Sequence, residues 1–168
     1  MKWIKLTAFL SILLAFSFSL SSCERASEEK KLTDFQKSGI VMSYSQEPVF
    51  PVQTPSPALG SMDVFYTRET RILTYSFKWS GLTGPVTAFH IHGLAPAGYS
   101  TAVVQTFVLT SIIPCAPGTV TTCGSYSGTL LIDGVVVKEQ DLLNGLYYIN
   151  IHTTLNPSGE IRGQIRFQ

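Results

Sequence analysis

The sequence predicts an all-β domain, an antiparallel β-sandwich or barrel of about eight strands with one short helix. Three observations support this fold class. Large apolar side chains alternate with polar ones through residues 70–79, as in a half-buried strand. Two more alternating runs, 147–153 and 160–167, flank an Asn-Pro-Ser-Gly turn and predict a closing β-hairpin. Other strand candidates recur at short intervals, and only one segment has helical character.

The elements before the hairpin can be placed in order. The strands expected there are 38–45, 61–67, 70–79, 86–92, 101–109 and 125–132. A tight turn near Arg68-Glu69 joins the second strand to the third. Four prolines, Pro48, Pro51, Pro55 and Pro57, predict an irregular edge segment after the first strand. The helix is expected at Lys138–Asn144, followed by Gly145, because glycine readily adopts the positive φ of a C-terminal cap.

The N-terminal region predicts export and lipid attachment. Residues 1–22 combine two early lysines with a short apolar stretch, as in a signal peptide. Leu20-Ser21-Ser22-Cys23 resembles a bacterial lipobox, in which the cysteine is lipidated and becomes the new N-terminus. Residues 23–35 are then a flexible tether, and the protein is expected outside the cytoplasm on the cell membrane or outer membrane. The alternatives are an uncleaved anchor or an ordinary signal peptide with a chance cysteine.

Two cysteines remain if Cys23 carries lipid. Cys115 and Cys123 flank a turn-rich loop, and an exported protein can oxidise them to a disulfide. A metal-binding pair is the alternative, but no further cysteine and no nearby histidine completes such a site.

The charge of the chain argues against nucleic acid as a partner. Only 14% of residues are charged and the net charge is +1, so no basic patch is available for nucleic acid.

All three histidines fall on the polar, outward faces of predicted strands. His90 and His92 are two residues apart, so both imidazoles point the same way, about 7 Å apart at the backbone. His152 has the corresponding position on the first hairpin strand. Three imidazole nitrogens form a ligand set that zinc and copper both accept, on the condition that the two strands lie side by side in one sheet or face each other across a barrel. No cofactor is fixed by the sequence, and copper and zinc are the candidates.

The same face offers an interpretation without metal. Asn150, Glu160, Arg162 and Gln164 share it with the histidines, and Glu160 and Arg162 are expected to form an ion-pair network. Hydrogen bonds from the histidines to these side chains would fix strand register, at roughly 0.2–1 kcal/mol for each cross-strand pair. No nucleophile, oxyanion donor or phosphate loop accompanies the set, so an enzyme is not expected.

The alternation also restricts the hairpin register. Ile149 and Ile151 must face the same side as their partners, so His152 pairs with an even-numbered residue. A five-residue loop, 155–159, would place His152 opposite Arg162 and Asn150 opposite Gln164, with Gly159 free to take positive φ. A shift of two residues, with His152 opposite Glu160, is also compatible with the pattern.

Several motifs together resemble the CHRD (chordin) domain family over residues 36–168. The motifs are Phe89-His90-Ile91-His92-Gly93, Gly145-Leu146-Tyr147-Tyr148-Ile149-Asn150-Ile151-His152-Thr153 and Asn156-Pro157-Ser158-Gly159-Glu160-Ile161-Arg162-Gly163-Gln164-Ile165. Gln46-Glu47-Pro48-Val49 resembles the opening segment of that family, and Ser80-Gly81-Leu82-Thr83-Gly84 the turn before its His-x-His strand. The resemblance implies an all-β domain that acts as a binding or structural module.

A fainter resemblance links the chain to the Greek-key sandwich of copper–zinc superoxide dismutases. In that family a His-x-His strand and a histidine just before the closing hairpin supply copper ligands, and His90, His92 and His152 have analogous places. The chain has no bridging histidine, no zinc-loop histidines and no fourth copper histidine, so dismutase chemistry is not expected.

The sequence therefore predicts a lipid-anchored, extracytoplasmic CHRD-domain lipoprotein that works as a non-catalytic binding or structural module. Its expected partners are the membrane and an extracellular or envelope protein. The alternative function is metal binding through the three histidines.

Overall fold

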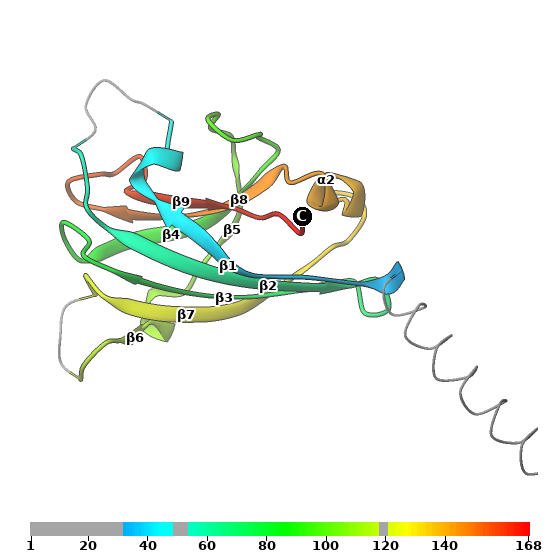
Figure 1. The fold of residues 1–168 in the computed structure, drawn as a ribbon, viewed down its shortest axis with the longest axis horizontal. Helices are drawn as coiled ribbons and strands as arrows, with labels where there is room; N and C mark the ends of the chain where they lie inside the picture. Colours follow the sequence, from blue (N-terminus) through cyan, green and yellow to red (C-terminus); the bar gives the residue numbers. More distant parts are fainter. Residues whose placement is uncertain (1–31, 49–53, 118–120) are drawn as a thin grey trace, which may run out of the picture. The chain divides into compact units, whose positions relative to one another are not determined.

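In the part of the chain that the structure describes, nine strands form one largely antiparallel sheet in the order β5-β4-β8-β9-β1-β2-β3-β7-β6 (Figure 1). The computed structural model describes residues 32–48, 54–117 and 121–168. Residues 35–168 cluster as one unit, separate from residues 1–34. The strands are β1 (Asp34–Ser43), β2 (Leu59–Thr67), β3 (Ile72–Ser80), β4 (Val86–Gly93), β5 (Val103–Thr106), β6 (Ile113–Pro114), β7 (Gly124–Leu131), β8 (Tyr147–Thr153) and β9 (Ile161–Gln164). Helix α2 (Glu139–Leu143) and the 3-10 turns η1 (Tyr44–Gln46) and η2 (Leu109–Ser111) complete the described elements.

The sheet curls so that strands far apart in its order share one aromatic core. Phe89 of β4 and Phe77 of β3 are not neighbours in the sheet, yet their ring centroids are 5.8 Å apart. Tyr126 of β7 lies 5.0 Å from both Phe89 and Phe107, which follows β5. Edge-to-face and offset ring pairs add about 0.5–1.5 kcal/mol each to the burial of apolar area. The all-β sandwich or barrel class predicted from the alternation is confirmed.

A side-chain bridge reinforces this closure at the β5 edge. The hydroxyl of Tyr75 donates to Oε1 of Gln105 at 3.1 Å, and Nε2 of Gln105 donates to the carbonyl of Thr129 at 3.1 Å. Strand β5 is thereby held against β3 and β7, although it pairs with β4 in the sheet. The curl leaves one face of β4, β8 and β9 on the core and turns the other face outward.

The predicted elements are present, with shifted ends. The first strand begins at Asp34, four residues before the expected start, and β5 is shorter than the expected 101–109 because a 3-10 turn follows it. Strand β6 was not predicted, since a strand of two residues is too short to show alternation of apolar and polar side chains. Helix α2 lies inside the expected segment, and Gly145 has φ +72°. Its N–H donates to the carbonyl of Leu142 at 3.0 Å, which closes the helix end as predicted.

The hairpin uses the second of the two permitted registers. Asn150 pairs with Arg162 and Ile151 with Ile161, so the register with His152 opposite Arg162 is wrong by two residues. The chain turns earlier than a five-residue loop would allow, because the N–H of Thr153 already bonds to the carbonyl of Asn156 at 3.3 Å. The shift of two residues leaves every side chain on its predicted face, since Ile151 still pairs with an isoleucine on the core face.

Cys115 and Cys123 form the predicted disulfide, with their Cα atoms 5.5 Å apart. The signal peptide at 1–22, Cys23 and most of the tether at 23–35 lie outside the described residues. Within the described part of the chain, no helix has both the length and the apolar character needed to cross a membrane.

Candidate metal centre

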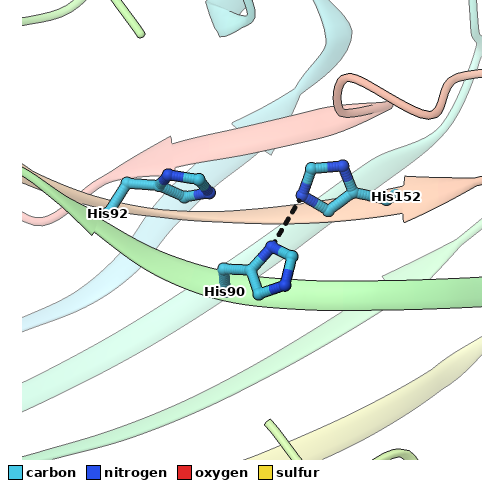
Figure 2. Close-up of side chains that lie close together, drawn as sticks. All are labelled: His90, His92 and His152. Atoms are coloured by element: carbon cyan, nitrogen blue, oxygen red, sulfur yellow. Dashed lines mark hydrogen bonds between the residues drawn. The ribbon is translucent and has the colours of Figure 1, made fainter. Parts of the chain in front are cut away.

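The three histidines come together on the outward face of β4 and β8 (Figure 2). Strand β4 supplies His90 and His92, and β8 supplies His152. The two strands are antiparallel neighbours, in which His90 pairs with Asn150 and Ala88 with His152. Paired residues point to the same face, so the adjacency required for convergence is present. One ligand nitrogen from each ring lies within 4.8 Å of the other two.

The closest contact in the cluster joins His90 to His152. Nδ1 of His90 is 3.0 Å from Nε2 of His152, as the dashed line in Figure 2 marks. The ring centroids of His90 and His92 are 5.4 Å apart, and those of His92 and His152 are 6.3 Å apart. A tetrahedral ion with metal–nitrogen bonds of about 2.0–2.1 Å places its ligand atoms about 3.4 Å apart. The His90–His152 pair is near that spacing, and the ligand nitrogen of His92 lies within 4.8 Å of the other two.

Backbone carbonyls fix the orientation of two of the rings. Nδ1 of His92 is 2.9 Å from the carbonyl oxygen of Thr101, and Nδ1 of His152 is 2.9 Å from that of Pro157. A carbonyl oxygen only accepts, so each Nδ1 carries the hydrogen and each neutral ring keeps its lone pair on Nε2. Both Nε2 atoms belong to the cluster. A ligating histidine usually donates its other N–H to such a partner, which sets its tautomer and orientation.

The electrostatic environment keeps the imidazoles neutral. Burial lowers the pKa of His152 to about 4, and the neighbouring His90 and His92 lower it further despite the bond to Pro157. Burial is also the main cause of the lowered pKa values of His90 and His92. A neutral imidazole has a lone pair to donate to a metal. The cluster therefore presents neutral nitrogen donors at physiological pH.

The ring of His92 is also fixed by stacking. It lies parallel to the ring of Tyr148, with centroids 4.8 Å apart and an interplanar angle of 4°. The guanidinium of Arg162 lies over the same tyrosine ring at 3.4 Å. A desolvated cation–π contact of this kind is worth about 2 kcal/mol. Tyr148 thus links one histidine of the cluster to a fully buried cation.

The polar face, which the sequence places on the outward side of the strands, is covered by the rest of the chain. Arg162 and Glu160 are 0% exposed, and His92 and His152 are each 8% exposed. Arg162 donates to the carbonyls of Tyr99 at 2.7 Å and Pro96 at 3.1 Å, both in the loop between β4 and β5. That loop lies over the face because the sheet side chains satisfy its backbone.

The expected ion-pair network between Glu160 and Arg162 is wrong within the described residues. The Glu160 carboxylate accepts from the hydroxyls of Ser56 at 2.6 Å, Thr83 at 2.7 Å and Thr153 at 2.5 Å. These donors hold its pKa below the usual range, although burial opposes them. Gln164 donates to the carbonyls of Ala95 and Gly145. Of the predicted set, Asn150 is the member that contacts a histidine among the described residues, with its Oδ1 2.9 Å from Nε2 of His152.

Glu47 is a buried acid of this face that the sequence analysis did not single out. It is 6% exposed, and burial raises its pKa from 4.5 to about 7, although Asn150 and Arg162 act in the opposite direction. A Cβ atom on Gly159, which has φ +127°, would collide with the Glu47 carboxylate. The feature that could have identified Glu47 is its place in the segment that resembles the opening of the CHRD family.

A second concave feature lies elsewhere on the sheet. A pocket of about 580 Å³ lies where β2, β3, β6 and β7 meet, with the Cys115–Cys123 disulfide in its wall. Leu59, Ile113 and Trp79 supply apolar lining, and Lys78 lies beside it. No local pattern predicts this pocket, because its lining comes from four strands whose order in the sheet is not encoded locally.

These features define a class of protein: an all-β domain with a three-histidine cluster beneath a covering loop. Residues 40–165, most of the chain, match the model of the CHRD domain family, and the chain belongs to that family. Searches of curated proteins and of solved structures gave no match.

Proposed function

We propose that this CHRD domain is a non-catalytic binding module whose ligand is a copper or zinc ion held by His90, His92 and His152. We further propose that the module is attached to a bacterial envelope membrane through lipid on Cys23, outside the cytoplasm. An envelope or extracellular protein is the expected partner class. Nucleic acid is not, since the charge is low and without a basic patch.

One observation carries the metal proposal. Nε2 of His92 is buried, and no described residue lies in hydrogen-bonding geometry with it. A buried polar atom without a partner costs about 1–3 kcal/mol, so such atoms are rare unless something binds them. The bond from Nδ1 to Thr101 fixes this nitrogen as a lone-pair donor, and His92 offers one ligand nitrogen within 4.8 Å of one on His90 and one on His152. A transition-metal ion supplies what that lone pair lacks.

The donor set favours copper or zinc. Imidazole nitrogen suits both ions, whereas calcium and magnesium require oxygen ligands. The chain contains three histidines, all in this cluster, and the two cysteines outside the predicted leader junction are joined in a disulfide. Any metal ion that this chain binds through histidine must therefore be bound at this site.

The test is metal analysis of chain purified without a histidine tag, followed by copper and zinc titration against a competing chelator. We expect one ion per chain. His92→Phe should lower the affinity by more than about 100-fold, because the ring can still stack on Tyr148 but has lost its nitrogen. Lys37→Gln, an exposed change on β1, should leave the affinity unchanged. Binding that survives His92→Phe and the matching changes at His90 and His152 would refute the proposal.

The alternative is a module that binds no metal, in which the histidines only fix the sheet. The His90–His152 hydrogen bond is the observation that favours it, because neutral rings can satisfy each other at 3.0 Å. Under this alternative the histidine substitutions lower the unfolding free energy and the chain binds no ion in the titration.

Lipid attachment is tested separately. Cys23→Ser should release the protein from the membrane fraction into the soluble extracytoplasmic fraction, and the mass of the native chain should correspond to loss of residues 1–22 plus lipid. A substituted chain that stays in the membrane fraction and uncleaved, like the native one, would contradict this proposal.

A further inference from the structure

Among the described residues, Asn150 is the amide side chain in direct contact with the histidine cluster. It lies on β8, two residues before His152 on the same face, and it is the cross-strand partner of His90. The side chain is 2% exposed. Its Oδ1 is 2.9 Å from Nε2 of His152, nearly the distance that separates this Nε2 from Nδ1 of His90.

The contact between Asn150 and His152 brings two acceptors together. The hydrogen of neutral His152 is on Nδ1, which donates to the carbonyl of Pro157, so Nε2 carries a lone pair. An amide oxygen also only accepts. Two acceptor atoms at 2.9 Å repel each other unless a hydrogen or a cation lies between them.

A reversed amide would remove that repulsion, but Glu47 opposes reversal. The Glu47 side chain accepts a hydrogen bond from Asn150, and a Cβ on Gly159 would lie 2.8 Å from Nδ2 of Asn150 and against the Glu47 carboxylate. The NH₂ group of Asn150 is therefore directed at Glu47 and its oxygen at the imidazoles. Reversal would place the amide oxygen against Glu47 instead, where it is repelled by the ionised carboxylate.

We infer that Oδ1 of Asn150 is the fourth protein ligand of the metal ion, completing a closed site of three nitrogens and one oxygen. The inference rests on the proposed metal site and concerns its coordination. His90 then ligates through Nδ1, and His92 and His152 through Nε2. Glu47 is a positioning residue, because it acts on the metal through the orientation of the Asn150 amide.

The chemistry of this donor set has two consequences. An amide oxygen is a weak, neutral ligand, of the kind found at the long axial position of some copper sites, so the set suits copper at least as well as zinc. Four protein ligands leave no coordination position for a substrate, and closed four-ligand sites are characteristic of structural rather than catalytic metals. The closed site therefore gives a physical reason for a module without catalysis.

The experiment compares azide binding to the copper(II)-loaded full chain and two variants. A small anion such as azide enters an open coordination position and produces a charge-transfer band. We expect no such band from the native chain. Asn150→Ala should bind azide at one site per copper and lose about tenfold in copper affinity. Gln164→Ala removes another buried amide of the same face, which contacts Arg162 and loop carbonyls, and should do neither.

A second variant keeps the test valid if Asn150→Ala fails to fold. Asn150→Asp combined with Glu47→Gln restores an oxygen ligand, now anionic, beside an amide that can still donate to it. Copper affinity should then exceed that of the native chain by about tenfold or more, since charged ligands bind more strongly. A purely structural role for Asn150 predicts no gain.

The outcomes separate the two claims. Azide bands of equal strength in the native chain and Asn150→Ala would overturn the fourth ligand while leaving the three-histidine site in place. A native chain that binds no copper or zinc would overturn both.

Discussion

Replacing Glu47 with glutamine should remove a pH-dependent loss of stability from this domain. Burial raises the pKa of Glu47 from 4.5 to about 7, so the folded state binds its proton more tightly than the unfolded chain does. Stability from this group is complete below pH 4.5 and is lost as pH rises towards 7, where the buried acid ionises. At about 1.4 kcal/mol for each pH unit, the loss amounts to about 3 kcal/mol. Glu47→Gln has no proton to lose.

The measurement is urea unfolding of metal-free protein at pH 5 and pH 8. The histidines, whose pKa values are lowered, change stability in the opposite direction over part of this range, but they are present in both proteins. The difference between native and Glu47→Gln isolates the carboxyl group, and between pH 5 and pH 8 it should move by about 2.5 kcal/mol in favour of the variant. Glu69→Gln, in an exposed turn, is the control. Parallel stability curves for native and Glu47→Gln would refute the reasoning.

Three further predictions concern the covered face and the disulfide. Arg162→Lys should destabilise the domain by about 3 kcal/mol in urea unfolding, because one ammonium cannot replace a planar guanidinium that bonds to two loop carbonyls and stacks on Tyr148. The exposed change Arg68→Lys is the comparison, and equal effects of the two substitutions would contradict this prediction. Gly159→Ala should lower the thermal midpoint, since φ is +127° and the new methyl group meets Glu47; an unchanged melting curve would count against that contact. Alkylation without reductant should leave the intact mass unchanged, and reduction should cost roughly 2–3 kcal/mol; two alkylated thiols in exported protein would disprove the disulfide.

The alternation of side chains predicted the strands and their faces well, because it is a local property. It placed Ile151 on the core and His152 on the opposite face, as found. It could not choose between two hairpin registers, since both preserve parity and the choice depends on how residues 153–156 turn. Whether the three histidines would converge depended, for a similar reason, on which strands are neighbours. The adjacency of β4 and β8 is a non-local property of the sheet, and no spacing in the sequence encodes it.

Which loop covers the polar face could not be predicted, for a different physical reason. The loop between β4 and β5 covers the face through its backbone carbonyls, such as those of Pro96 and Tyr99. Every residue has a carbonyl, so no side-chain pattern marks the ones that will be used. A polar strand face therefore predicts solvent exposure by default, although the same side chains serve equally well as donors and acceptors for a covering loop.

The covered face divides into two regions, and the division separates the two interpretations that the sequence left open. Glu160 and Gln164 use their oxygen and nitrogen atoms to satisfy loop hydroxyls and backbone groups, so their burial is accounted for by structure. The region formed by the histidines and Asn150 differs, because Nε2 of His92 has no described partner and Oδ1 of Asn150 faces another acceptor. Under the proposal made above, a cation at their centre fills these lone pairs, whereas a purely structural network would pair each of them with a donor. On that proposal the same face combines a structural hydrogen-bond network with a group of donor atoms around a cation.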